Sequence, residues 1–158
     1  MRVRPAHPTD ALEIAGWFPD AEAVLRWGGH EPPFPVEPEW LAREFRSRSR
    51  AYFVAVEGAD EDPPLGLIGM RRHFRHGRVH LVRVGVKPDR RGEGIAARLI
   101  EAVAGVARAG GADRLTLNVY GSNTAAVRAY EKAGFAQFGT VATGDDPSGI
   151  VIRMARRL

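Results

Sequence analysis

The most regular alternation of apolar and polar positions in the chain lies between residues 94 and 109. Apolar side chains recur there three and four positions apart, at Ile95, Ala96, Leu99, Ile100, Val103, Val106 and Ala107. This spacing gathers them on one face of a helix. Because Gly110 and Gly111 follow, and glycine commonly ends helices, the pattern predicts an amphipathic helix over residues 94–109.

Shorter apolar runs, rich in β-branched and aromatic residues, predict strands. After a short extended segment at Val3, these runs cover residues 52–56, 65–70, 79–86, 115–119, 135–141 and 150–155. Weaker helical patterns cover residues 12–18, 39–50 and 123–133. Residues 28–38 contain four prolines and predict a loop.

The order of these segments predicts the fold class. Strands come before, between and after the helices, which is typical of an α/β domain. A helix between two strands allows them to lie parallel, whereas the short turns between strands 52–56, 65–70 and 79–86 favour antiparallel pairs. We therefore expect a mixed central sheet of about seven strands with about four helices.

The composition limits the protein further. A chain of 158 residues with 44% hydrophobic content fits one domain over residues 1–158. It holds no apolar run near the roughly 20 residues of a membrane span, and its first residues lack the apolar core of a signal peptide. We therefore expect a cytoplasmic protein without a membrane partner.

Cysteine content and net charge limit the reactions and the partners that we expect for this protein. The chain has no cysteine, which excludes disulfides, cysteine-ligated metal sites and a thiolate nucleophile of the protein. Its net charge of +4 favours anionic partners such as nucleic acid or a phosphorylated cofactor.

A glycine-rich segment, Arg90–Ala96, joins strand 79–86 to the long helix. The first amides of a helix lack intrahelical acceptors and lie at the positive end of its dipole. Gly92 and Gly94 leave space above these amides and allow the backbone to turn them toward one point. The segment predicts a phosphate site, although two glycines before a helix also fit a simple turn.

Two other functions compete with this interpretation. Gly92, Gly94 and Ala97 have the spacing of a dinucleotide fingerprint, which would indicate a nicotinamide-dependent oxidoreductase. However, residues 87–91 separate the strand from the first glycine, and no acidic residue ends strand 115–119. The basic run at residues 71–78 fits a nucleic-acid-binding module or a solvated turn, but no known reading motif accompanies it, so nucleic acid is not favoured.

Three segments together resemble the GNAT superfamily of N-acetyltransferases. They are Val84 to Pro88, Arg90–Ala96 and Asn123 to Phe135, which occur in the family's order. The resemblance is good over about residues 51–140 and implies a GNAT-like fold with two strands splayed at the cofactor. It also implies acetyl-CoA as co-substrate, no metal, and a primary amine of a small molecule or peptide as acceptor. A homodimer is one option for the assembly.

The resemblance also implies roles for individual residues. Those expected to hold the cofactor are Val84, Gly85, Val86, Arg91, Gly92, Glu93, Gly94, Ile95, Ala96, Asn123 and Tyr130. Tyr130 matches the family's general acid at the cofactor sulfur, and Asn123 either binds the pantetheine arm or only caps its helix. Asp89 departs from the family, which usually has Gln or Arg there, so its carboxylate should turn away from the pyrophosphate.

The general base and the acceptor site are less well defined. With no cysteine, the amine should attack the thioester directly in a ternary complex. The stretch where relatives carry a glutamate has none here, which leaves His80, with an ordinary pKa of about 6.5, and the weaker candidate Glu31. The acceptor is expected to contact Trp27, His30, Glu31 and Phe34, and aromatic walls of this kind suit an apolar or cationic amine.

Overall fold

The computed structural model of the protein describes residues 1–71 and 76–158. Four residues of the basic run at 71–78 therefore lie outside the described residues. Within the described part, seven strands and five α-helices follow one another as β1 (Arg2–Pro5), α1 (Ala11–Ala15), α2 (Ala21–Gly28), α3 (Pro38–Phe45), β2 (Arg50–Val56), β3 (Gly66–Arg71), β4 (Arg78–Val86), α4 (Ile95–Ala109), β5 (Arg114–Tyr120), α5 (Thr124–Lys132), β6 (Ala136–Ala142) and β7 (Ile150–Arg157). Short 3-10 turns, η1 (Pro8–Asp10) and η2 (Pro88–Arg90), precede α1 and α4.

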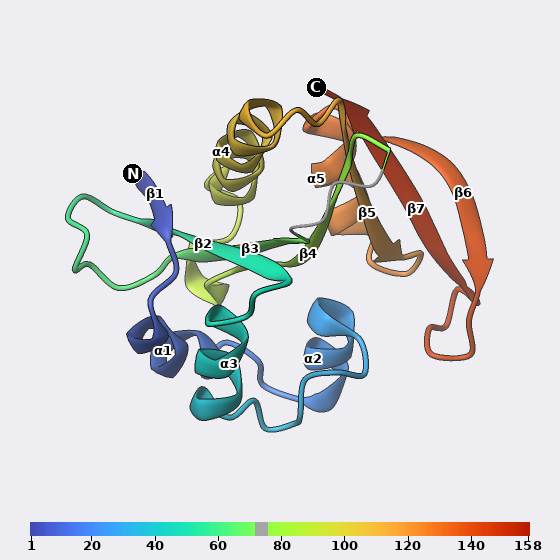
Figure 1. Cartoon of the computed structure of the whole chain (residues 1–158). Coiled ribbons are helices and arrows are strands. Elements are labelled where there is room, and N and C mark those ends of the chain that lie inside the picture. The colour runs from blue at the N-terminus through green and yellow to red at the C-terminus, as the bar shows by residue number, and fades with distance from the viewer. Residues whose placement is uncertain (72–75) are drawn as a thin grey trace.

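The strands form one mixed sheet in the order β1-β2-β3-β4-β5-β7-β6. Every neighbouring pair is antiparallel except β4 and β5, which are parallel. Helix α4 makes the crossover that such a parallel pair requires (Figure 1). The expected mixed sheet of seven strands is confirmed.

Helix α4 packs against one face of this sheet and forms the larger core. Its buried side chains are Ile95, Leu99, Ile100, Val103, Ala104 and Ala107. A Cβ on Gly66 of β3 would lie 2.9 Å from Leu99 Cδ1, which shows how closely the helix approaches the strand. Val106 was expected on the same face but is 41% exposed, because it lies at the edge of the buried face.

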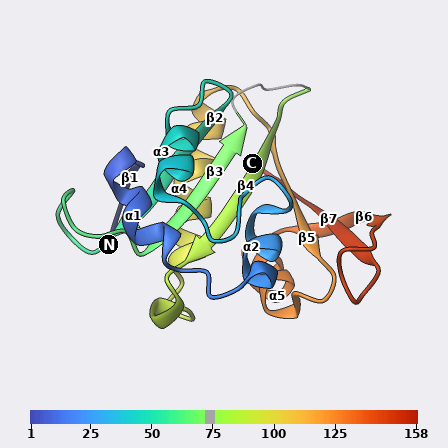
Figure 2. The same cartoon turned by 90° about the horizontal axis from the view of Figure 1, so that it is seen from below.

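Helices α1, α2 and α3 cover the opposite face, as Figures 1 and 2 show from two directions. A second core lies there, with Ile14 of α1 and Leu41 of α3 packed against Val54 of β2. The two cores on either side of the sheet make a three-layered molecule.

The structure corrects the expected helices in two places. Helix α2 was not predicted because its eight residues are too few for a clear period, although Asp20 Oδ1 accepts a hydrogen bond from Ala23 N at 2.8 Å as an ordinary helix cap. The helix expected over residues 39–50 ends at Phe45, because Arg50 already pairs with Arg71 in the sheet.

No helix within residues 1–71 and 76–158 is long and apolar enough to cross a membrane.

Candidate active site

The site begins where β4 and β5 separate. The two strands pair only at Arg78 with Arg114, Val79 with Leu115 and His80 with Thr116. β4 then continues to Val86 and β5 to Tyr120 without pairing to each other, and Figure 1 shows them diverging. Backbone groups along the two facing edges lack strand partners, so an extended ligand can bond to them.

A β-bulge in β4 changes the direction of its side chains. Leu67 of β3 pairs with Gly85, whereas Gly69 pairs with Val82, so β4 has an extra residue between these positions. Arg83 lies in this bulge with a positive φ of 52°. A non-glycine residue seldom adopts that conformation, and bulges of this kind often re-aim side chains near active sites.

The glycine-rich loop forms an open cradle at the start of α4. Gly92 and Gly94 have φ values of 84° and 77°, and a Cβ on either would meet no atom within 4 Å. Gly94 is the N-cap of this 15-residue helix, so the amides of Ile95 and Ala96 have no intrahelical acceptor. The open space, the free amides and the helix dipole fit a pyrophosphate.

Charged side chains around the loop stabilise it. Arg90 donates to Glu93 Oε1 at 2.8 Å and to Glu57 Oε2 at 3.0 Å. The hydrogen bond from Arg90 lowers the pKa of the Glu93 carboxyl. The charge of Arg90 is therefore offset within the protein, whereas Arg91 is exposed and can contact a phosphate.

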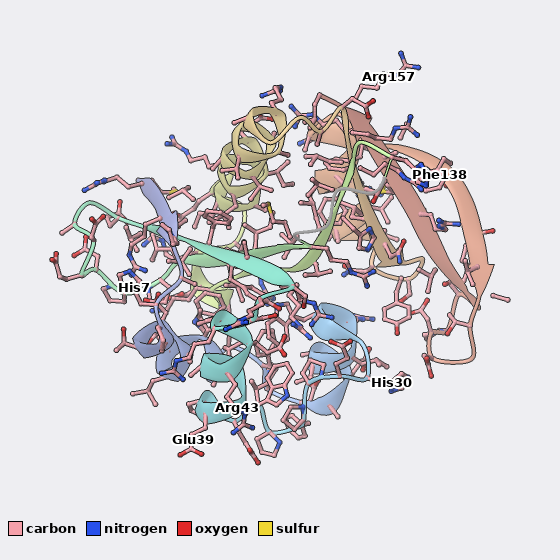
Figure 3. All side chains as sticks on the ribbon, viewed as in Figure 1. His7, His30, Glu39, Arg43, Phe138 and Arg157 are labelled. Atoms are coloured by element: carbon pink, nitrogen blue, oxygen red, sulfur yellow. The ribbon has the colours of Figure 1, made fainter. Side chains whose placement is uncertain are left out.

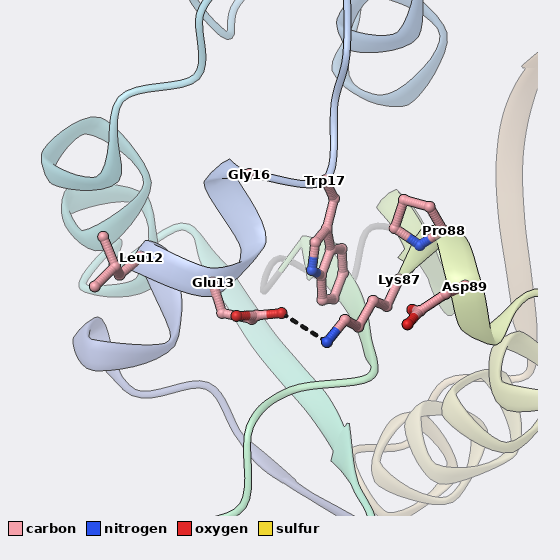
Figure 4. A pocket seen from close by; sticks show the side chains of 7 residues that line it. All are labelled: Leu12, Glu13, Gly16, Trp17, Lys87, Pro88 and Asp89. Atoms are coloured by element: carbon pink, nitrogen blue, oxygen red, sulfur yellow. Dashed lines mark ion pairs between the residues drawn. The ribbon is translucent and has the colours of Figure 1, made fainter.

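Asp89 lies on the side of the loop that faces α1. It lines a cavity of about 380 Å³ with Trp17 and Pro88, among other residues. In the same cavity the ammonium group of Lys87 lies 3.0 Å from Glu13 Oε1 (Figure 4). The carboxylate expected to turn away from the phosphate site thus has a place beside α1.

Tyr130 of α5 packs edge-on against Phe135, with 6.1 Å between the ring centroids. Burial raises the pKa of its phenol to about 12. The hydroxyl group therefore stays protonated throughout the physiological pH range and can donate a hydrogen bond.

Asn123 precedes α5 and caps it. Its Oδ1 accepts a hydrogen bond from Ala126 N at 3.4 Å. The capping interpretation is therefore correct for the oxygen, and the side-chain nitrogen is still able to donate to a ligand.

A cavity of about 290 Å³ opens between α2, the diverging ends of β4 and β5, and β7. Its lining consists of Leu25, Arg26, Trp27, Gly28, Gly29, Glu31, Arg50, Arg71, His80, Leu81, Val82, Arg83, Asn118, Val119, Tyr120 and Val151. We call it the acceptor cavity. Three of the residues selected from the sequence, Trp27, Glu31 and His80, meet in it.

The other two expected acceptor contacts lie outside this cavity. His30 Nε2 is 2.8 Å from Asp145 Oδ2 in the β6–β7 loop, and Phe34 is 49% exposed. Both follow α2 in the proline-rich loop, and the sequence could not show which side chains of that loop turn inward. Trp27 is fixed by stacking on Phe18 at 4.3 Å between centroids and by donating from Nε1 to the carbonyl oxygen of Arg83 at 3.2 Å.

His80 lies at the last paired position before the strands separate. Its Nδ1 is 2.8 Å from Oγ1 of Thr116, within hydrogen-bond distance. Burial, together with the smaller effect of the charges of Arg71 and Arg153, lowers its pKa to about 4. His80 is therefore neutral near pH 7.

An arginine–glutamate network forms one wall of the acceptor cavity, and the sequence did not reveal it. Arg50 Nη1 lies 3.0 Å from both Glu31 Oε2 and Glu44 Oε2. Arg83 Nη2 lies 2.5 Å from Glu31 Oε2, and Arg83 Nη1 donates to Glu44 and to the hydroxyl of Tyr52. Arginines are frequent along this chain, so nothing in the sequence singled these two out.

The network determines whether Glu31 can accept a proton. The hydrogen bond from Arg50, together with the charges of both arginines, lowers the pKa of the Glu31 carboxyl. A carboxylate held in its anionic form by two guanidinium groups is a poor proton acceptor. Glu31 is thus better suited to position the arginines than to act as a base.

The phosphate cradle lies on one side of two diverging strands, and a cavity opens on the other side. This arrangement defines a class of enzyme that brings a phosphorylated co-substrate to a second substrate. The chain belongs to the acetyltransferase (GNAT) family, whose family model matches residues 19–135.

Solved structures share the fold. A spermidine N-acetyltransferase chimera from Vibrio cholerae and hSSAT is 20% identical, with a TM-score of 0.75 over 99% of this chain and 96% of that one. The GNAT domain of S. lividans PAT is 22% identical, with a TM-score of 0.77 over 99% and 90%. AAC(6')-Ib in complex with paromomycin and acetyl-CoA is 21% identical, with a TM-score of 0.73 over 98% and 92%. At these identities the likeness is one of fold.

Proposed function

We propose that the protein transfers an acetyl group from acetyl-CoA to a primary amine by direct attack in a ternary complex. The observation that carries the proposal is the gap between β4 and β5, which separate after His80 and Thr116. The phosphate cradle adjoins one side of this gap, and the acceptor cavity opens on the other. Family membership favours acetyl transfer over a nicotinamide-dependent oxidoreductase or a nucleic-acid-binding module.

The residues of the cradle and of β4 fit acetyl-CoA, which supplies the activated thioester. The space beside Gly92 and Gly94 is open, and the amides of Arg91 to Ala96 would hold the pyrophosphate there. The free edge of β4 at Val84 to Val86 would bond the pantetheine arm, and the side-chain nitrogen of Asn123 adds a donor.

The protein has to assist three changes during the reaction. The amine nitrogen forms a bond to the acetyl carbon while the carbon–sulfur bond breaks, one proton leaves the amine, and one proton reaches the sulfur. A backbone amide near Val86 stabilises the negative charge that develops on the acetyl oxygen.

Tyr130 serves the leaving sulfur. A thiol has an ordinary pKa of about 8.5, so full proton transfer from a phenol of pKa about 12 is uphill by about 5 kcal/mol. Tyr130 therefore acts as a hydrogen-bond donor that stabilises the departing thiolate, and the proton ultimately comes from solvent.

His80 is the candidate proton acceptor for the amine. With a pKa of about 4 it is neutral at pH 7. In the tautomer in which Nδ1 donates to Thr116 Oγ1, Nε2 accepts a hydrogen bond from the amine or from an intervening water. It is a weak base, which means that the amine has to enter the reaction largely in its neutral form.

Thermal unfolding with and without coenzyme A tests the proposal. Coenzyme A at 100 times its dissociation constant should add about 2.7 kcal/mol, or roughly 5–10 °C in melting temperature. Thiol release in the presence of acetyl-CoA and a panel of amines then tests turnover. An unchanged melting temperature at millimolar coenzyme A would contradict the proposal.

A pair of glycine variants localises the phosphate site. Gly92→Ala and Gly111→Ala place a methyl group at nearly the same backbone conformation, with φ of 84° and 88°, and neither new Cβ meets an atom within 4 Å. Their costs in stability should match, but only Gly92→Ala projects into the proposed pyrophosphate site. We expect it alone to weaken coenzyme A binding at least about tenfold. Equal affinities of the two variants would place the phosphates elsewhere.

The cytoplasmic location and the homodimer that the sequence led us to expect stay predictions. Size-exclusion chromatography with light scattering tests the second.

A further inference from the structure

Most of the charged side chains that line the acceptor cavity are cations. Its charged lining consists of four arginines and one glutamate, namely Arg26, Arg50, Arg71, Arg83 and Glu31. Glu44 also contacts two of these arginines. These four arginines outnumber Glu31 and Glu44, whereas the charges of Asp145 and Asp146 act on Tyr120, another residue of the lining.

The ion pairs show where this excess lies. Arg50 and Arg83 share Glu31 and Glu44, so their charges are offset. At the cavity's edge, Arg26 pairs with Glu22 one helical turn away, at 3.0 Å.

Arg71, at the end of β3, differs from these three. It is exposed and has no ion pair within residues 1–71 and 76–158. It is the cation of this cavity whose charge the described residues do not offset.

Two arginines on neighbouring strands lie side by side next to the cavity. Arg50 of β2 and Arg71 of β3 are direct partners in the antiparallel register, so their side chains project from the same face. Glu31 and Glu44 offset the charge of Arg50, whereas no carboxylate among the described residues pairs with Arg71 beside it. Both residues line the acceptor cavity, which places this point inside the proposed acceptor site.

The charges of two arginines act on the inner end of the cavity. His80 lies there, where β4 and β5 separate, and the charges acting on it come from Arg71 and Arg153. A polycation entering the cavity would meet this field, whereas a bound carboxylate would be attracted by it. The same field favours the neutral form of an amine near His80, which is the form that attacks.

We infer that the acceptor is a small amine that also carries a carboxylate, held by Arg71 next to Arg50 with its amine toward His80. The inference rests on the proposed acetyl transfer and adds its substrate class. It makes polycations poor acceptors, in contrast to the spermidine and aminoglycosides named for proteins of the same fold.

Matched acceptors test the inference. Thiol release from acetyl-CoA is measured with the L-amino acids, with the corresponding amino-acid amides, which lack the carboxylate, and with spermidine. We expect at least one amino acid to give a kcat/KM about tenfold or more above both its amide and spermidine. Amides or spermidine that react as well as the acids would overturn the inference and leave acetyl transfer intact.

The proposed function can fail separately. If coenzyme A stabilises the protein but no member of the panel releases thiol, both the carboxylate acceptor and turnover are overturned. If coenzyme A gives no stabilisation, acetyl-CoA binding itself is overturned.

An arginine variant with a matched control localises the carboxylate. Arg71→Gln removes the exposed guanidinium in the cavity, and Arg43→Gln removes one on the outer side of α3, where Figure 3 labels it. Both change the net charge equally. We expect Arg71→Gln alone to lower the ratio of kcat/KM for the amino acid to kcat/KM for its amide about tenfold, with the KM for acetyl-CoA unchanged. An unchanged ratio of acid to amide in Arg71→Gln would overturn the assignment.

Discussion

Tyr130 and His80 both have pKa values far from the ordinary ones, and for the same reason. Tyr130 loses water where α5 packs on the core beside α4, and His80 loses water within the sheet beside the acceptor cavity, which disfavours the charged form of each. Burial therefore raises the pKa of the Tyr130 phenol to about 12 and lowers that of His80 to about 4. Both residues remain neutral across the range in which an amine loses its proton.

Replacing Tyr130 tests its role at the sulfur. Tyr130→Phe keeps the ring that packs on Phe135 and removes only the hydroxyl group. We expect kcat to fall roughly 100-fold, with the KM for acetyl-CoA nearly unchanged, because the hydrogen bond to sulfur matters in the transition state. A normal melting temperature serves as control for folding. A kcat equal to that of the unaltered protein would exclude the role.

His80 makes stability depend on pH in a definite direction. Its pKa is about 4 in the folded protein and about 6.5 in the unfolded chain, so the unfolded chain takes up a proton first as the pH falls. The contribution of His80 to the free energy of unfolding is complete above pH 6.5 and is lost between pH 6.5 and about 4. Between pH 7.5 and 4.5 the loss amounts to at most about 2.5 kcal/mol.

Urea unfolding of the protein and of His80→Gln at these two pH values measures this contribution. We expect the variant to lose less stability on acidification than the unaltered protein. Equal losses would show that His80 titrates normally. The pH dependence of kcat/KM should likewise be the same near pH 6.5 in the unaltered protein and in His80→Gln.

At the scale of elements, α4 links the core to the phosphate cradle. Its first residue, Ile95, is almost fully buried, and its N-cap, Gly94, forms part of the cradle. The apolar face thus fixes the direction in which the free amides point. Helix α4 holds the cradle in place because it is anchored along its length.

A pair of truncations tests this anchoring. Leu99 is fully buried and Val106 is 41% exposed on the same helix. Leu99→Ala should lower the free energy of unfolding by about 3–4 kcal/mol, whereas Val106→Ala should cost less than about 1 kcal/mol. Denaturant unfolding gives both values. Similar costs would mean that α4 does not pack as described.

At the scale of the whole molecule, the sheet brings the two halves of the proposed site together. Helices α4 and α5 lie on one side of it, and α2 covers the acceptor cavity on the other (Figure 1). The two substrates of the proposed reaction would meet at the gap between β4 and β5. Its existence depends on the pairing of both strands elsewhere, with β4 bonded to β3 and β5 to β7.

The sequence by itself determined the order of strands and long helices, the glycine loop and the pairing of this loop with the segment from Asn123 to Phe135. These features depend on neighbouring residues, through helical period, alternation and the backbone freedom of Gly92 and Gly94. Family membership, which the match over residues 19–135 shows, could be expected from them.

Only the tertiary structure decided what the acceptor cavity is made of. Arg50, Arg71 and Arg83 come from three different strands, and the bulge at Arg83 and the register of Arg50 with Arg71 bring them to one wall. Pairings between distant segments leave no local period in the chain. The aromatic residues seen in the sequence suggested an apolar or cationic amine, whereas the arginines gathered by the fold favour an amine with a carboxylate.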